Sequence, residues 1–217
     1  MTLTRLQQGL QSIYELDICH DIHDYLITSR EMAAFLDSGQ SRRETREKLL
    51  VHEDGEDLNL SLYLDQDIVE RFADGAFPEG MDHTGIQDYC LALEGISHFV
   101  YLVWNATYDR SVTLMEMELQ AEIDKFVMLT DFLDQQSAVL APGQLRHLLF
   151  QSAYYHDDLD EREQERYRLA SHYAQKYCQR LESRFSPNGR KDLWLNELRR
   201  FYRLNRKGKL DYIDRLH

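Results

Sequence analysis

A glutamate and a histidine interrupt the most apolar stretch of the chain. Residues 89–104 read YCLALEGISHFVYLVW and include Glu94 and His98. At helical spacing these two side chains lie one turn apart on the same face, in a helix so apolar that it must be almost wholly enclosed. A carboxylate and an imidazole taken out of water need partners, because an unpaired buried charge is costly. The pattern therefore predicts a polar site inside the protein.

The expected partners lie on the next helix, over residues 112–133. If this helix pairs antiparallel with the preceding one across residues 107–111, Glu118 and Glu122 reach the depth of Glu94 and His98. Two interpretations stay open. In the first, these residues and Lys125 form a buried network of hydrogen bonds and ion pairs. In the second, they bind iron, manganese or zinc, as carboxylates and histidines do in helical bundles, although the usual paired Glu-x-x-His motifs are absent.

The composition is that of an ordinary globular protein. The chain has 217 residues, 43% of them hydrophobic and 29% charged, and a net charge of −13. It contains no apolar run long enough for a membrane span, its first residues lack the apolar core of a signal peptide, and its three cysteines form no Cys-x-x-Cys pair. We expect a single domain over 1–217, located in the cytoplasm, with reduced cysteines and no membrane span.

Hydrophobic spacing predicts a mainly α fold, an irregular helical bundle of about six to eight helices. Only residues 48–65 carry a β signal: Asp54-Gly55 suits a turn, and alternating leucines follow it. We expect a β-hairpin inserted there and a basic helical segment at 186–217. The longer helical patterns cover residues 3–16, 84–106, 112–133, 144–155 and 192–204, together with a long helix that Asp158 or Asp160 can cap and that ends near residue 185. Shorter helical patterns cover residues 29–36, 65–73 and 209–216.

Three smaller groups of polar residues resemble fragments of metal sites. They are His20 with His23, the residues around His52, and His156 with Asp157 and Asp158. A structural zinc site normally uses four protein ligands, and calcium loops spread their oxygens over a twelve-residue frame, so none of these groups suffices alone. We interpret them as surface or helix-capping residues.

Basic residues concentrate at the end of the chain. Residues 186–217 contain nine Lys or Arg against four acidic residues. The segment either docks on the acidic body of the protein or binds an acidic partner, and a net charge of −13 disfavours nucleic acid. The candidate partner-binding residues are Arg199, Arg200, Arg203, Arg206 and Lys207.

Sequence signatures of catalysis are missing: there is no phosphate loop, Gly-x-Ser-x-Gly elbow or His-Glu-x-x-His. We therefore expect a non-catalytic protein-interaction or adaptor module without a cofactor, which binds a protein partner or associates with itself. The alternative is a metal-binding protein or metalloenzyme whose ligands are Glu94, His98, Glu118 and Glu122.

Overall fold

The structure is a computed structural model that describes residues 1–37, 45–55, 57–73, 83–135, 143–151, 160–185 and 191–215. Within these ranges it contains nine α-helices, one short 3₁₀ helix and one three-stranded sheet. The prediction of a mainly α fold with one β-hairpin is confirmed. Among the described residues, no helix combines the length and apolar character needed to cross a bilayer.

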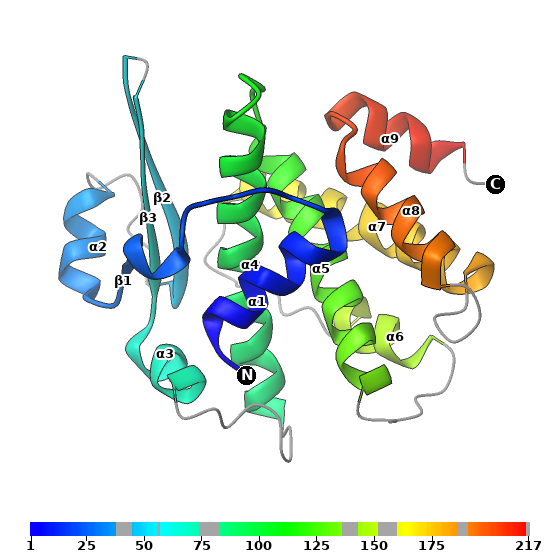
Figure 1. Ribbon diagram of the computed structural model, residues 1–217, viewed down its shortest axis with the longest axis horizontal. Coiled ribbons are helices and arrows are strands. Elements are labelled where there is room, and N and C mark those ends of the chain that lie inside the picture. The colour runs from blue at the N-terminus through cyan, green and yellow to red at the C-terminus, as the bar shows by residue number, and fades with distance from the viewer. Residues whose placement is uncertain are drawn as a thin grey trace.

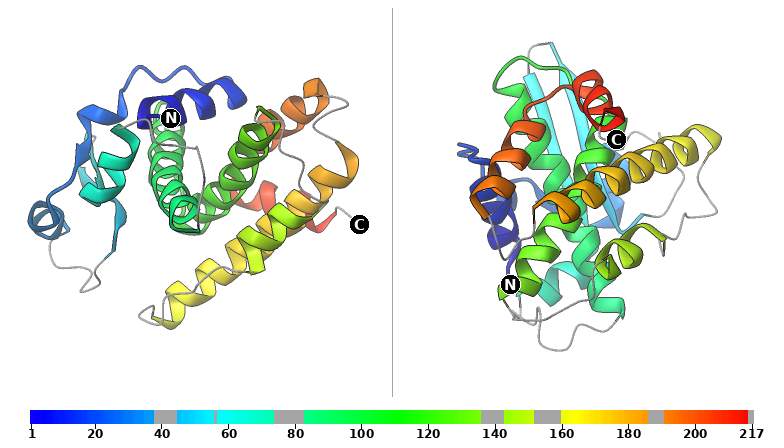
Figure 2. Two further views of the ribbon diagram at one scale, coloured as in Figure 1. Left: turned by 90° about the horizontal axis from the view of Figure 1, so that it is seen from below. Right: turned by 90° about the vertical axis from the view of Figure 1, so that its right-hand side faces the viewer.

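Two long helices form the centre of the protein. Helix α4 (His83–Ala106) and helix α5 (Leu114–Gln135) lie antiparallel, and the sheet packs on the other side of α4 (Figure 1). Helix α7 (Glu161–Arg184) crosses the far side of α5 (Figure 2). Both central helices are apolar around most of their circumference because each is covered on more than one side. Polar side chains between them are therefore largely shielded from solvent.

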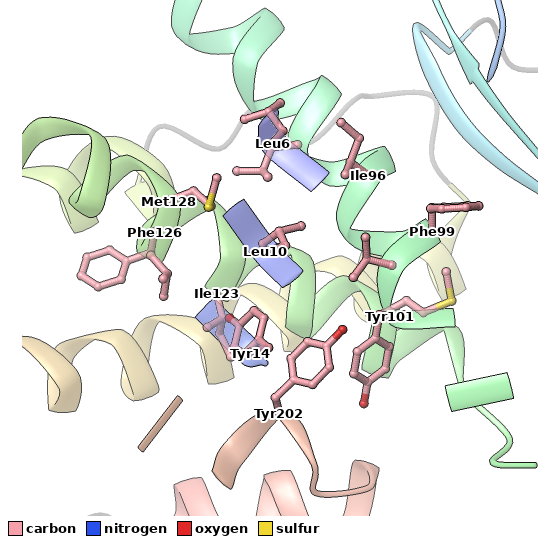
Figure 3. Packing of buried hydrophobic residues seen from close by; sticks show 14 of the residues in the cluster. Leu6, Leu10, Tyr14, Ile96, Phe99, Tyr101, Ile123, Phe126, Met128 and Tyr202 are labelled. Atoms are coloured by element: carbon pink, nitrogen blue, oxygen red, sulfur yellow. The ribbon is translucent and has the colours of Figure 1, made fainter. Parts of the chain in front are cut away.

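Helix α1 (Leu3–Tyr14) closes one side of this centre. Thr2 caps its first turn, and its leucines and Tyr14 form one apolar stripe. Figure 3 shows Leu6, Leu10 and Tyr14 among the buried side chains of α4 and α5, with Tyr202 beside Tyr14. The rings of Tyr14 and Tyr202 stack with their centroids 4.1 Å apart. Residues from both ends of the chain thus complete the same core.

The sheet has the order β1-β3-β2. Strands β2 (Glu47–Asp54) and β3 (Asp57–Leu64) form the predicted antiparallel hairpin, in which Gly55 takes a φ of +65° at the turn. Strand β1 (Leu26–Ile27) pairs parallel with β3 and was not predicted, since two residues carry no periodic signal. The sheet lies between α4 and helix α2 (Arg30–Leu36), and helix α3 (Gln66–Ala73) follows it (Figure 1).

A glycine allows the hairpin to approach α4 closely. A Cβ atom on Gly95 would lie 2.7 Å from Leu62 Cδ1 and 2.8 Å from Glu47 Oε1. Both distances are shorter than any normal contact, so a larger residue there would displace the side chains of Leu62 and Glu47. Gly95 stands between Glu94 and His98 in the sequence, and the sheet therefore meets α4 at the predicted polar site.

The last four helices cover α5 and α1. Asp160 begins α7 with a capping box that includes Glu163. The predicted break after 185 falls at 186–190, outside the described residues. The other three helices are α6 (Gln144–Gln151), α8 (Lys191–Tyr202) and α9 (Arg206–Asp214).

Leu62→Ala should destabilise the protein by roughly 2–4 kcal/mol, because Leu62 is completely buried between the sheet and α4 and its truncation leaves a cavity. Val51→Ala, on the exposed part of β2, should cost less than about 1 kcal/mol and serves as the control. Urea unfolding monitored by circular dichroism measures both. Equal costs would show that the hairpin is not packed on the helices as described.

Candidate functional site

Three of the four predicted ligands come together at the junction of α4 and α5. Glu94, His98 and Glu118 each offer a ligand atom, and these atoms lie within 4.8 Å of one another. Glu94 and His98 share one face of α4, as their spacing predicts, and Glu118 faces them from α5. The side chains of His98 and Glu118 are only 8% and 9% exposed.

Glu122, the fourth predicted ligand, lies beside this group and is bound to a lysine. Lys125 Nζ donates to Glu122 Oε1 at 2.8 Å and to Glu94 Oε2 at 2.6 Å. The ammonium therefore links one residue of the ligand group to Glu122. The predicted network of ion pairs and the predicted cluster of ligands coexist, with Glu94 belonging to both.

Two further charged residues reach the junction from elements that the sequence pattern did not connect with it. Glu47, on β2, has its Oε1 atom 3.9 Å from His98 Nδ1. Arg166, on α7, has its Nε atom 3.8 Å from Glu118 Oε1. Only the tertiary fold brings Glu47 and Arg166 to α4 and α5. The glycine next to Glu94 is the one local sequence feature that indicates a close approach of another element.

The junction contains buried polar atoms without hydrogen-bond partners among the described residues. They include His98 Nε2, Glu47 Oε1 and Arg166 Nε. Glu118 Oε2 lies 3.5 Å from His98 Nε2, which is within ion-pair distance but too long for a good hydrogen bond. Two ligand atoms on one tetrahedral ion, each bound at roughly 2.0–2.2 Å, lie about 3.3–3.6 Å apart. The separation therefore fits two ligands of one ion better than it fits a donor and an acceptor.

Burial and mutual repulsion shift the pKa values of the acidic groups. Burial, reinforced by the charge of Glu94, raises the pKa of Glu47 to about 8. Burial also raises the pKa of Glu122, although Lys125 opposes the shift. Burial alone would lower the pKa of His98, but the carboxylate of Glu118, with Glu47 and Glu94, outweighs it and raises that pKa to about 9. These shifts favour the protonated forms of Glu47 and His98.

The junction carries a surplus of negative charge. Four carboxylates, from Glu47, Glu94, Glu118 and Glu122, face two permanent cations, Lys125 and Arg166, and Arg166 also pairs with Glu163 of its own helix at 3.8 Å. A neutral His98, the form that binds metals, adds no charge to this balance. A divalent ion would offset a surplus of this sign.

A second buried polar cluster lies on the side of α5 opposite Glu118 and Glu122. Its side chains are well hydrogen-bonded. Asp124 accepts hydrogen bonds from Tyr14 at 2.5 Å, Ser97 at 2.6 Å and Gln120 at 2.8 Å. Gln120 Oε1 in turn accepts from Lys209 Nζ at 2.7 Å. Local sequence patterns do not connect Asp124 with Tyr14 or Lys209, because these residues lie on three different helices. Its hydrogen bonds make this cluster a structural network.

Lys209 is completely buried in this second cluster. Its ammonium lies 4.3 Å from the ring centroid of Tyr101 and also contacts the rings of Phe201 and Tyr202. Burial lowers the pKa of Lys209 to about 7, although Glu116 and Asp124 oppose the shift. Burial also raises the pKa of Asp124 to about 6, against its three hydrogen bonds. Both groups therefore have pKa values shifted toward their neutral forms.

Part of the predicted basic surface docks on the protein itself. Arg199 Nε donates to Ile13 O at 2.9 Å, and Arg203 donates to Tyr14 O at 3.0 Å. These carbonyls end helix α1, where cations are favoured by the helix dipole. The guanidinium of Arg200 lies over the ring of Tyr212, and Arg206 and Lys207 are exposed. A role for these last three residues in partner binding stays a prediction.

The other candidate groups have local roles where the structure describes them. His20 contacts Tyr25, His23 contacts Thr4, and Asp21 caps the 3₁₀ helix η1 (Ile22–Asp24), in agreement with surface and capping roles. The predicted group at His156, Asp157 and Asp158 lies outside the described residues.

Comparison with known proteins does not assign the chain to a family. No protein-family model matches the sequence, and searches of the curated proteins and of the solved structures find no significant match. Function is therefore inferred from the site itself.

Lys209→Met should remove part of the pH dependence of stability. Because the pKa of Lys209 is lower in the folded state, the unfolded chain binds more protons, and this group makes the parent protein more stable as the pH rises from 7. Between pH 7 and pH 9 the parent should gain roughly 2 kcal/mol relative to the variant. Urea unfolding at both pH values measures the difference, and parallel profiles would contradict the burial of a protonatable Lys209.

Replacing Arg199 and Arg203 together by Met should lower the free energy of unfolding by roughly 1–3 kcal/mol, because the carbonyls at the end of α1 lose charged donors. Lys207→Met removes an exposed charge from the same segment and should leave stability within about 0.5 kcal/mol of the parent. Thermal and urea unfolding provide the measurement. An unchanged double variant would show that these arginines do not hold the segment to α1.

Proposed function

We propose that the protein binds one divalent transition-metal ion through Glu94, His98 and Glu118. The observation that carries the proposal is His98 Nε2, which is buried without a hydrogen-bond partner and lies 3.5 Å from a carboxylate oxygen of Glu118. A buried ring nitrogen left without a partner costs stability, and a metal ion between it and the carboxylates would satisfy it. Iron, manganese and zinc are the ions named in the alternative interpretation of the sequence.

The second polar cluster provides an internal comparison. Both clusters contact α5, both are buried, and both contain carboxylates and a lysine. The Asp124 carboxylate, however, accepts three hydrogen bonds, whereas His98 Nε2 and Glu47 Oε1 have no partner among the described residues. This difference supports metal binding at the first cluster and a purely structural role for the second.

The donor set indicates the kind of ion. One imidazole and two carboxylates suit zinc, manganese or iron, whereas calcium and magnesium prefer all-oxygen sites. Three protein ligands leave one coordination position open, whereas a closed structural zinc site normally has four. The side chains of His98 and Glu118 are nevertheless less than a tenth exposed, so solvent and substrate have little access to the ion. We propose that the bound ion stabilises the junction of α4, α5 and the sheet.

Equilibrium dialysis against Zn²⁺ and Mn²⁺, followed by elemental analysis, tests the proposal. The parent protein should retain one ion per chain, and Glu118→Gln and His98→Gln should each weaken binding by at least about 100-fold, because a direct ligand matters more than an outer partner. The bound ion should also raise stability, by roughly 2.7 kcal/mol at a free concentration of 100 times Kd.

Glu165→Gln is the matched control. Glu165 pairs with Arg168 on the surface of α7, and its loss should change neither stoichiometry nor affinity. A parent protein that retains no ion, or a Glu118→Gln variant that binds as tightly as the parent, would contradict the proposal.

A further inference from the structure

Glu47 lies on the side of the His98 ring that a metal ion at Nε2 would leave free. Glu118 Oε2 pairs with Nε2 at 3.5 Å, and Glu47 Oε1 pairs with Nδ1 at 3.9 Å. The two nitrogens of an imidazole ring point in different directions, so one carboxylate faces each. Glu47 Oε1 is buried and has no hydrogen-bond partner among the described residues.

We infer that Glu47 is the positioning residue of the metal site: it accepts the Nδ1–H hydrogen bond of His98 and so directs Nε2 toward Glu94 and Glu118. This inference depends on the proposed metal binding. Histidines that bind metals usually donate their second ring N–H to a carboxylate or carbonyl, which fixes the tautomer and the orientation of the ring. Glu47 supplies such an acceptor from β2.

His98 Nδ1 lies 3.9 Å from Glu47 Oε1, which makes Nδ1–H the donor that the geometry favours. The charged groups that act on the Glu47 carboxylate include Glu94, His98, Glu118 and Lys125. The two other glutamates are acceptors when ionised, and Lys125 directs two of its three N–H groups to Glu94 and Glu122. A displacement of roughly 1 Å would bring Glu47 Oε1 and His98 Nδ1 to the hydrogen-bond distance of about 2.9 Å.

The fold holds Glu47 at this position through the hairpin. Glu47 pairs in register with Leu64, which is completely buried, and Gly95 allows the Glu47 carboxylate to pass close to the backbone of α4. A positioning residue on β2 makes metal affinity depend on how the sheet docks against α4. By linkage, a bound ion must stabilise that docking to the same extent.

The direct test is NMR of the protein labelled with ¹⁵N-histidine and titrated with Zn²⁺. The resonances of His98 are assigned by their absence from His98→Gln. The inference predicts that Zn²⁺ binds Nε2 of His98 while Nδ1 keeps its proton. Binding of Zn²⁺ through Nδ1 would overturn the inference. This test uses the parent protein and needs no substitution at Glu47.

Variants of Glu47 test the same inference through affinity. Glu47→Ala removes the acceptor and should weaken Zn²⁺ binding about 10–100-fold, as the loss of an outer partner does. Glu47→Gln keeps an acceptor oxygen at the same place and should recover most of the affinity, a rescue that a loss of packing alone would not produce. Glu53→Ala, at an exposed position of the same strand, should bind like the parent.

The outcomes separate the two proposals. A parent protein that binds no Zn²⁺ overturns both. A parent protein that binds Zn²⁺ while Glu47→Ala binds it equally well overturns only the role of Glu47. If Glu47→Ala fails to fold, the ring nitrogen identified in the parent decides the question.

Discussion

Four glutamate carboxylates are enclosed where strand β2 and helix α5 meet helix α4, and their mutual repulsion must be offset. Lys125 and Arg166 neutralise two of them, and the remaining charge requires protons or a metal cation. Three features of the structure bring these charged side chains together at the junction. Gly95 admits the carboxylate of Glu47, α7 delivers Arg166, and the antiparallel pairing of α4 with α5 places Glu118 opposite His98.

Helix α5 carries two polar strips with different roles. One strip contributes Gln120 and Asp124 to a network in which Tyr14, Ser97 and Lys209 supply the donors. This network joins α1, α4, α5 and α9, and so ties both ends of the chain to the centre of the protein. The other strip contributes Glu118 and Glu122 to the junction with the sheet. A metal ion bound there would stabilise the second strip, as hydrogen bonds stabilise the first.

The sequence was sufficient to predict the elements with strong periodicity. The apolar stretch around Glu94 and His98 predicted α4, the alternating leucines predicted the hairpin, and helical spacing placed Glu118 at the depth of His98. Proximity along the chain made this last prediction possible, since α4 and α5 are joined by a short connection. The sequence did not predict that Glu94 belongs both to an ion-pair network and to a ligand group, because the distances between these side chains are set by the tertiary fold.

Contacts between distant segments could not be predicted from local pattern. Nothing in the sequence around Glu47 indicates that it reaches His98, and a lysine such as Lys209 in an exposed-looking basic segment is normally solvated. The two-residue strand β1 pairs with β3 only because tertiary packing places it there. The basic segment was expected either to dock on the protein or to bind a partner, and Arg199 and Arg203 dock on the end of α1.

The central claim is that one divalent ion binds between Glu94, His98 and Glu118. Anomalous X-ray diffraction from crystals grown with Zn²⁺, recorded on both sides of the zinc absorption edge, locates such an ion directly. A single anomalous peak within roughly 2.0–2.2 Å of His98 Nε2 and of an oxygen from each glutamate is the expected result. An empty junction, with zinc absent or bound only at surface histidines, would contradict the claim.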